Sequence, residues 1–362
     1  MKIIEVSEVL PALKRNKTAS LFFLLSGEHP TLPFSELKSI LEAEGYEYRI
    51  SGKLTQVLRL ETNAKSIRSI RARAAMTRVC ASELFTCNTS LSDIYGKMQN
   101  APLEGFIEKG EDFVVRVRRV RETAPSVTRM ELERRLGEII LNRVEGVKVN
   151  LHTPKKTFFG VLTDNQLVFG LKLAEILPTP FVKRSPKKRP FFHPSAMPAK
   201  LARCMVNLAR PKAGELVLDA FCGTASLLVE AGLIGCRVIG LDAQRYMVKG
   251  SLRNLRHYGV EPEGMAVADA LHLPIAEVDC IVTDPPYGRL ATTLGQKTRD
   301  IIEDFLSKVA DRIPKGRKIC IAAPKTVKIG EIGKALGFKH VESHFVYVHR
   351  SLTREITVFE RS

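Results

Sequence analysis

Between residues 191 and 362, short apolar segments alternate with longer amphipathic ones. Strands are predicted at 216–221, 236–241, 264–268, 279–283 and 317–322, and the sequences between them have helical spacing. This alternation is typical of a parallel sheet with helices on both faces. Two further predicted strands, at 340–348 and 354–359, are expected to form an antiparallel hairpin at an edge of the sheet. The fold class predicted for this part of the chain is α/β, with a mostly parallel seven-stranded sheet.

An aspartate stands at or just after the end of four of these strands: Asp219, Asp242, Asp269 and Asp284. The carboxyl ends of parallel strands share one edge, where open α/β sheets bind their ligands. Gly223 follows the first strand, and a glycine there lets a ligand approach the backbone closely. Asp242 ends the next strand, where an acid can hold both hydroxyls of a ribose. The stretch has neither the G-x-G-x-x-G fingerprint nor the lysine of a P-loop.

The most specific motif is Asp284-Pro285-Pro286-Tyr287, directly after an apolar strand. The two prolines remove two backbone donors and make the turn rigid. The Asp284 carboxylate and the Pro285 carbonyl remain as acceptors, without competing amide donors. Tyr287 offers a flat face on which a base can stack. The motif therefore suits a planar substrate that presents an NH2 group.

With these motifs, residues 191–362 resemble the Rossmann-like class I methyltransferases that use S-adenosylmethionine to methylate exocyclic amines of nucleobases. The segment from Arg189 to Met197 resembles the stretch before the cofactor strand of those enzymes. The chain departs from their usual Asp-Pro-Phe-Cys-Gly-Thr-Gly loop, because Ala220 replaces the proline and Ala225 the second glycine.

The resemblance also implies site residues. The catalytic residues it implies are Asp284, Pro285 and Tyr287, and no metal is implied. The residues that it places at the cofactor are Asp219, Phe221, Gly223, Asp242, Ala243, Asp269, Ala270 and Asp284.

The first half of the chain has a different pattern. A strand at 19–25 and a helix at 35–44, with Ser35 as its N-cap, indicate a small α+β unit. A helix is predicted at 67–82 and an arginine-bearing strand at 113–120. This half resembles a ferredoxin-like domain followed by a THUMP module, a pair found in tRNA-modifying enzymes. The predicted division is 1–62 (ferredoxin-like), 63–172 (THUMP), 173–190 (basic, proline-rich linker) and 191–362 (methyltransferase).

The charge balance favours a nucleic-acid partner. Fifty-six lysines and arginines against 39 aspartates and glutamates give a net charge of +17. A positive excess of this size suits a polyanion, because each phosphate contact releases condensed counterions. The residues predicted to contact RNA lie on the basic segments: Arg71, Arg73, Arg78, Arg116, Arg118, Lys187, Lys188 and Arg189.

Cysteine usage and hydropathy indicate a cytoplasmic protein. The seven cysteines include no C-x-x-C pair, which argues against disulfide frameworks and zinc sites. The longest apolar run, 21–25, is far shorter than the roughly 18 residues that a membrane span needs. The N-terminus lacks a basic-then-apolar signal pattern. The high net charge favours a monomer.

Over nearly the whole chain, the sequence resembles archaeal-type tRNA (guanine-N2) methyltransferases that act at position 10. This implies methyl transfer from S-adenosylmethionine to the 2-amino group of guanosine, giving N2-methyl- and N2,N2-dimethylguanosine. Alternatives are an rRNA or DNA amino-methyltransferase, a dinucleotide-dependent oxidoreductase and a non-catalytic RNA-binding protein. The absence of G-x-G-x-x-G disfavours a dinucleotide-dependent oxidoreductase. The intact Asp284 disfavours a non-catalytic RNA-binding protein. His193 could contact the cofactor or substrate, or could be a structural residue of a turn, and the sequence leaves both roles open. Cys222 has no expected catalytic role.

Overall fold

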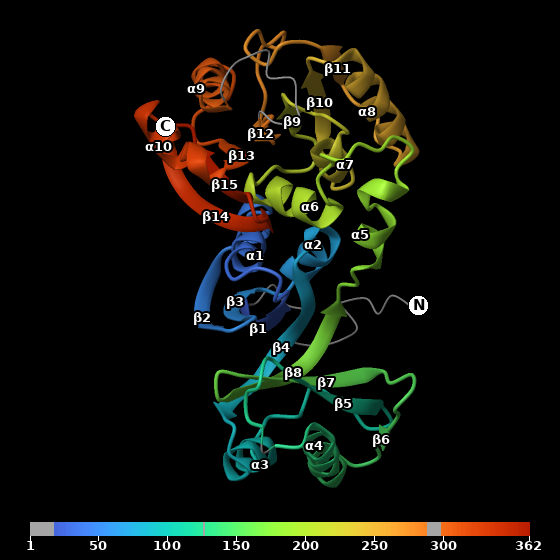
Figure 1. Ribbon diagram of the computed structural model, residues 1–362. Coiled ribbons are helices and arrows are strands. Elements are labelled where there is room, and N and C mark those ends of the chain that lie inside the picture. The colour runs from blue at the N-terminus through green and yellow to red at the C-terminus, as the bar shows by residue number, and fades with distance from the viewer. Residues whose placement is uncertain (1–17, 126, 288–297) are drawn as a thin grey trace. The chain divides into compact units, whose positions relative to one another are not determined.

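The computed structural model describes residues 18–125, 127–287 and 298–362. They form two compact units, each with its own sheet (Figure 1). Unit 1 holds 18–30, 45–71 and 77–177, and unit 2 holds 31–44, 72–76 and the described part of 178–362. The boundaries predicted at 62, 172 and 190 concern domains rather than compact units and stay predictions.

Unit 1 is built on an eight-stranded sheet with the order β2-β3-β1-β4-β8-β7-β5-β6. Its strands are β1 (Thr18–Leu25), β2 (Tyr48–Leu54), β3 (Val57–Asn63), β4 (Thr77–Asn88), β5 (Asp112–Arg119), β6 (Lys148–Val149), β7 (Lys156–Thr163) and β8 (Gln166–Glu175). Helices α3 (Leu91–Gln99) and α4 (Arg129–Arg143) bury apolar side chains with β5 and β7 in one core. Phe113, Phe158 and Phe169 are fully buried at its centre.

The helix predicted at 67–82 is wrong in its second half. Helix α2 spans Ser66–Arg73, and strand β4 begins at Thr77. Residues 79–82 pair with β1, and Val79 and Ala81 are buried in the sheet core. Sheet burial and β-branched residues thus override the helical spacing here.

Unit 2 confirms the α/β prediction, with a seven-stranded sheet in the order β11-β10-β9-β12-β13-β15-β14. Its strands are β9 (Leu216–Asp219), β10 (Arg237–Asp242), β11 (Gly264–Val267), β12 (Cys280–Thr283), β13 (Lys318–Pro324), β14 (Lys339–His349) and β15 (Leu352–Glu360). The first five are parallel. Strand β15 runs antiparallel to β13 and β14, so the predicted edge hairpin is present.

Helices cover both faces of the second sheet (Figure 1). They are α5 (Thr179–Lys183), α6 (Ala199–Leu208), α7 (Ser226–Gly232), α8 (Arg245–His257), α9 (Thr298–Val309) and α10 (Ile329–Ala335), with short 3-10 turns at Pro186–Lys188 and Lys325–Val327. One core joins α6 and α7 to the sheet, and the other joins α9 and α10. Among the described residues, no helix has the length and apolar character to cross a membrane.

Helix α1 (Leu32–Ala43) belongs to unit 2, where it packs against α6. Glu36 is fully buried and accepts hydrogen bonds from the backbone N–H groups of Ala75 and Met76, at 3.0 and 2.7 Å. Its Oε1 also accepts a bond from Asn207 Nδ2 of α6, at 2.9 Å. The N-cap is Thr31 and not the predicted Ser35, because Pro33 can occupy the first turn without losing a helical bond.

Candidate active site

The four aspartates predicted at strand ends lie along one edge of the second sheet. Asp219 ends β9, and Asp242 ends the neighbouring β10. Asp269 follows β11, and Asp284 follows β12 on the other side of β9. The parallel order brings all four to the carboxyl edge of the sheet, where open α/β sheets bind their ligands.

Asp219 ties the two central strands together. Its side chain is fully buried, and its Oδ1 accepts bonds from Thr283 Oγ1 at 2.6 Å and from the Phe221 N–H at 3.2 Å. Burial raises the pKa of Asp219 to about 7, against the lowering effect of these two bonds. Burial therefore favours the protonated form of this carboxyl group.

The loop after β9 is held by the end of β10. The Gly223 N–H donates to Asp242 Oδ2 at 2.9 Å, and the Cys222 N–H donates to the Leu241 carbonyl at 2.8 Å. Gly223 has a φ of +52° and Ala225 a φ of +60°. Ala225 thus keeps the left-handed backbone that a glycine favours, which explains how the loop tolerates the departure from the usual pattern.

Both carboxylate oxygens of Asp242 accept hydrogen bonds from backbone N–H groups. Oδ1 accepts a bond from the Gln244 N–H and Oδ2 one from the Gly223 N–H, both at 2.9 Å. The side chain is half-buried, and burial raises its pKa. Each oxygen keeps a lone pair for a further donor.

The remaining predicted cofactor residues differ in exposure. Asp269 is exposed and accepts bonds from the Leu271 N–H at 3.0 Å and the His272 ring at 3.1 Å. Ala243 is exposed and Ala270 buried. Phe221 is half-buried and meets Phe305 edge-on, with ring centroids 5.3 Å apart.

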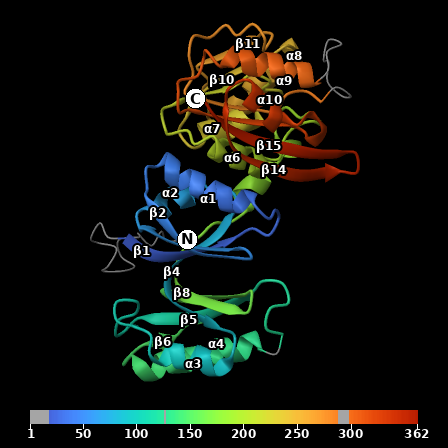
Figure 2. The same ribbon diagram turned by 90° about the vertical axis from the view of Figure 1, so that its left-hand side faces the viewer.

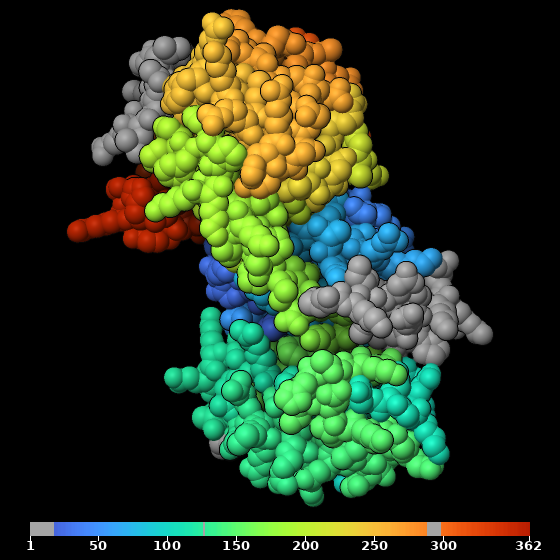
Figure 3. Space-filling view, turned by 90° about the vertical axis from the view of Figure 1, so that its right-hand side faces the viewer, coloured from blue at the N-terminus to red at the C-terminus, as the bar shows by residue number. Residues whose placement is uncertain are grey.

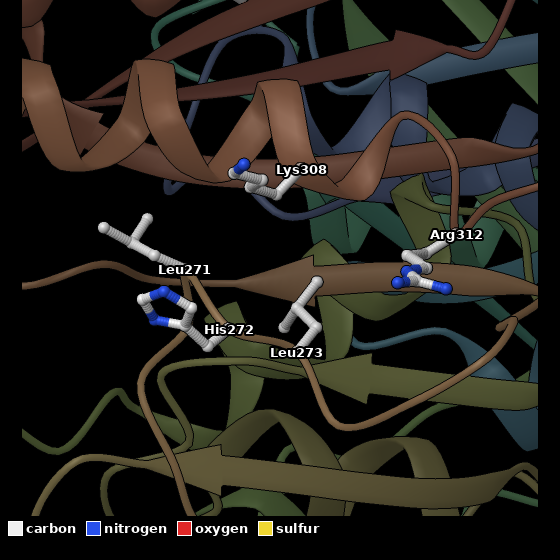
Figure 4. A pocket seen from close by; sticks show the side chains of 5 residues that line it. All are labelled: Leu271, His272, Leu273, Lys308 and Arg312. Carbon is white, nitrogen blue, oxygen red and sulfur yellow. The ribbon is translucent and has the colours of Figure 1, made fainter.

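A surface hollow of about 390 Å³ begins beside Asp269. Figure 4 shows its lining side chains, which come from the loop after β11, from α9 and from the turn that follows α9: Leu271, His272, Leu273, Lys308 and Arg312. None of the predicted site residues lines this hollow.

Asp284, Tyr287 and Arg354 form a closed ring of polar contacts. The Tyr287 hydroxyl donates to Asp284 Oδ1, and Arg354 Nη2 lies 3.3 Å from Asp284 Oδ2. Arg354 Nε donates to the Tyr287 hydroxyl at 2.8 Å. Burial raises the pKa of Asp284, while the Arg354 charge and the Tyr287 bond lower it. The pKa of Tyr287 is well above its usual value because of burial and the adjacent Asp284, so its hydroxyl stays protonated.

Arg354 is the site residue that sequence reasoning missed. It lies near the start of β15, where it pairs with Pro324 at the end of β13. An antiparallel strand begins where its parallel neighbours end, so the first residues of β15 reach the carboxyl edge. The sequence did contain a signal for Arg354. The predicted edge hairpin implies a return strand that starts near residue 354, at the carboxyl edge of the sheet.

The predicted RNA-contacting residues separate into three groups by their exposure. Arg71, Arg116, Arg118, Lys187 and Lys188 are exposed. Arg78 is half-buried and paired with Glu28 at 3.0 Å.

Arg73 and Arg189 are buried, and the prediction that they contact RNA is corrected. Arg73 donates to Glu44 and to the Pro211 carbonyl, at 2.7 and 2.9 Å. Arg189 donates to Ser226 Oγ of α7 and to the Arg184 carbonyl. In both residues, each guanidinium nitrogen donates to an acceptor within the protein itself.

His193 and Cys222 lie beside the loop without a reactive arrangement. His193 Nδ1 is 2.7 Å from Ser195 Oγ, and its ring opposes only in part the rise that burial causes in the pKa of Asp242. Cys222 is buried, and burial raises its pKa well above the usual value. All seven cysteines are free and buried. A thiol held protonated in this way is a poor nucleophile.

Comparison with known proteins identifies two domains. Residues 88–171 match the THUMP domain, and residues 186–355 match the RMKL-like methyltransferase domain. The crystal structure of TrmN from Thermus thermophilus shares the fold, with a TM-score of 0.53, 22% identity, and coverage of 95% of this chain and 100% of that one.

Two archaeal relatives extend over almost the full chain. The tRNA (guanine(10)-N2)-dimethyltransferase of Methanothermobacter thermautotrophicus is 37% identical, covering 93% of this chain and 98% of the relative. That of Methanocaldococcus jannaschii is 31% identical, covering 94% and 99%. With a THUMP domain, a methyltransferase sheet and this degree of identity, the chain belongs to the archaeal-type THUMP-domain tRNA (guanine-N2) methyltransferases.

Proposed function

We propose that the chain transfers methyl groups from S-adenosylmethionine to the 2-amino group of guanosine 10 in tRNA, giving N2-methyl- and N2,N2-dimethylguanosine. The observation that carries this proposal is the Asp284 carboxylate at the carboxyl edge, held between Arg354 and Tyr287. The curated relatives that share the whole chain are named for this reaction. As part of the proposal, the enzyme works as a cytoplasmic monomer without a metal.

The residues of the loops after β9 and β10 fit S-adenosylmethionine. Asp242 is half-buried and keeps one lone pair on each oxygen, which suits the two ribose hydroxyls. Asp269 is exposed at the next strand end, where its carboxylate can accept from the adenine amino group. Gly223 leaves the loop backbone open toward the methionine part, and the buried Asp219 below it favours a cationic ligand. When bound, S-adenosylmethionine supplies an electrophilic methyl group on a sulfonium sulfur.

Asp284 and Pro285 perform the chemistry at the guanine amino group. Its nitrogen lone pair is delocalised into the ring, so the nitrogen is a weak nucleophile. Hydrogen bonds from the amino group to the Asp284 carboxylate and the Pro285 carbonyl draw the nitrogen toward tetrahedral geometry. They also stabilise the positive charge that develops on it. Asp284 then accepts the proton that the methylated nitrogen loses.

Tyr287 must exchange partners when the base enters. Its hydroxyl bonds to the same carboxylate that the amino group needs. Rotation of this side chain frees an Asp284 oxygen and presents the ring to the face of the base, which fixes the angle of attack. After the first transfer, one hydrogen remains on the nitrogen for one acceptor, so a second methylation is possible.

The experiment that tests the proposal uses full-length protein, unmodified tRNA and labelled S-adenosylmethionine, followed by nucleoside analysis. We expect methylated guanosine at position 10, and no product when inosine, which lacks the 2-amino group, replaces it. Asp284→Ala is expected to abolish most single-turnover activity while tRNA and cofactor binding survive, since the interaction is used chiefly in the transition state. Asp304→Asn on the exposed face of α9 is the control. Product on rRNA or DNA instead of tRNA would overturn the assignment.

The cofactor assignment has its own test. Asp242→Asn keeps both side-chain positions but replaces one acceptor oxygen by a donor group. We expect S-adenosylmethionine affinity, measured by calorimetry, to fall by about 1.5–3 kcal/mol, the scale of a lost charge-assisted bond. Unchanged affinity would remove Asp242 from the ribose site.

A further inference from the structure

The tip of the β14–β15 hairpin carries exposed aromatic side chains on an edge strand. Phe345 and Tyr347 lie two residues apart on β14, and their exposed fractions are 48% and 71%. Strand β14 is the last strand of its sheet. The red C-terminal segment projects from the surrounding surface in Figure 3, and the hairpin extends beyond the helices of unit 2 in Figure 2. Large apolar groups on an exposed edge strand are a liability unless something binds them.

The surroundings of these rings are cationic. Lys325 Nζ lies 5.3 Å from the centroid of the Phe345 ring. His349 and Arg350 are exposed at the turn, and Arg350 makes no ion pair within the described part of the chain. Glu355, which pairs with Phe345 across the strands, is itself buried and accepts a bond from Ser343. The tip therefore presents flat rings and positive charge together, which is the combination that binds single-stranded nucleic acid.

The register places this surface next to the catalytic corner. Arg354, which contacts Asp284 and Tyr287, pairs with Val346. Side chains alternate along a strand, so Phe345 and Tyr347 flank Val346 at the same strand end but project from the opposite face of the sheet. Thr353, the neighbour of Arg354, pairs with Tyr347. The strand order β12-β13-β15-β14 places β14 three strand spacings from β12, about 14 Å across the sheet. The aromatic positions are thus within reach of the nucleotides that flank a base extruded into the corner.

We propose that Phe345 and Tyr347, with Lys325 and Arg350, bind the RNA strand beside the target guanosine. In this arrangement, an unstacked neighbouring nucleotide stacks on the Tyr347 ring. Lys325 and Arg350 contact its flanking phosphates. The inference rests on the proposed function, since it takes the target base to be in the Asp284 corner. A second copy of the chain pairing with the β14 edge is the competing occupant.

The test compares Tyr347→Ala, Tyr347→Phe and the control Val348→Ala, an exposed aliphatic change on the same strand. For Tyr347→Ala we expect the affinity for unmodified tRNA, measured by fluorescence anisotropy, to fall roughly 5- to 100-fold, the range found for a base–aromatic stack. Tyr347→Phe and Val348→Ala are expected to bind as wild type, and S-adenosylmethionine affinity to stay unchanged in all three. Binding is the readout, so the result does not depend on turnover.

A second arm identifies the contacted nucleotide. The tRNA used here carries an abasic residue on one side of the target guanosine. The affinity of the wild type for this tRNA should fall by the same factor as the Tyr347→Ala change causes, and the affinity of Tyr347→Ala should not fall further. Equal tRNA affinity of Tyr347→Ala and wild type would overturn the inference while leaving the proposed methylation intact. Conversion of a dimer into a monomer by Tyr347→Ala, seen by sedimentation with unchanged tRNA affinity, would assign the surface to a second copy instead. Methylation of another base in wild type would refute the proposed function separately.

Discussion

Arg354 determines how readily Asp284 stays ionised. Among the described residues, Arg354 is the cation that pairs with the half-buried carboxyl, which also contacts the Tyr287 hydroxyl and feels the charge of the buried Asp219. Burial alone raises the pKa of Asp284, and Arg354 opposes this effect. The ionised form, which accepts the amino hydrogen bonds, therefore depends on a residue far away in the sequence.

We expect Arg354→Met to raise the pKa of Asp284 further, so that the acid limb of the pH–rate profile moves to higher pH. Single-turnover methylation should fall roughly tenfold or more near neutral pH, on the scale of about 1.5 kcal/mol for a charged hydrogen bond, and recover as the pH rises. Arg354→Lys keeps a positive charge, so the acid limb of its pH–rate profile should lie between those of the wild type and Arg354→Met. A loss that is uniform at every pH would instead show that Arg354 acts only on packing.

Asp219 makes the stability of the chain depend on pH. Its pKa is raised to about 7 in the folded protein, above the value of about 3.9 in an unfolded chain. At low pH the carboxyl group is protonated in both the folded and the unfolded chain, so its raised pKa does not change the free energy of unfolding. As the pH rises from about 4 to about 7, the raised pKa lowers the free energy of unfolding by up to about 4 kcal/mol. Above about pH 7 this destabilisation is constant.

Asp219→Asn removes this titration but keeps an oxygen for Thr283 and the Phe221 N–H. We therefore expect the melting temperature of the variant, relative to wild type, to increase from pH 5 to pH 7 and then to level off. A difference independent of pH would show that Asp219 is ionised when folded at all these pH values. The variant is also expected to bind the cationic cofactor less tightly, so stability and function oppose each other here.

At the scale of elements, a buried ionic cluster attaches the linker to the cofactor domain. Glu230 of α7 is fully buried and accepts from Arg184 at 2.7 and 3.0 Å, and Arg203 of α6 lies 2.8 Å away. The sequence predicts a proline-rich linker here, and the segment folds into α5 and a 3-10 turn.

Glu230→Gln removes the carboxylate that pairs with both guanidinium groups. We expect the free energy of unfolding in urea to fall by about 3–5 kcal/mol, the cost of breaking a buried ion pair. Glu303→Gln, on the exposed face of α9, should change it by less than about 0.5 kcal/mol. Equal stability of both variants would mean that the cluster is not held in the folded state.

The same cluster shows where sequence reasoning succeeds and where it stops. Strand ends and the Asp284 motif could be predicted because periodicity and turn chemistry are local. Buried and solvated arginines look identical in a basic run, so Arg189 was assigned to RNA. Its partner Ser226 and the nearby Glu230 lie on α7, and only the tertiary fold brings them together. Arg354 was missed for the same reason, because its role depends on strand pairing.

At the scale of the whole molecule, the cofactor-binding unit includes early parts of the chain. Helix α1 and residues 72–76 belong to it, and Asn207 of α6 bonds both Glu36 and the Arg73 carbonyl, at 2.9 and 3.1 Å. The fragment 191–362, which the sequence suggests as a methyltransferase domain, lacks these segments and also Arg184 and Arg189.

We therefore expect 191–362 expressed alone to lack a cooperative thermal transition and to bind S-adenosylmethionine weakly or not at all. Its uncovered α6 face would expose apolar surface, which dye binding and circular dichroism can report. A fragment that melts cooperatively and binds cofactor like the full chain would show that α1 is dispensable for the fold.

Because unit 2 takes α1 and residues 72–76 from within the first hundred residues, the chain passes between its units five times, at residues 30, 44, 71, 76 and 177. A single genetic crossover in the proline-rich segment would separate α6 from the helix that covers it. Recombination can thus exchange unit 1 for another only by carrying α1 along or by replacing it with an equivalent helix. Descendants of such a chain are expected to inherit both halves together, and gene fusions in this lineage to occur outside the two units.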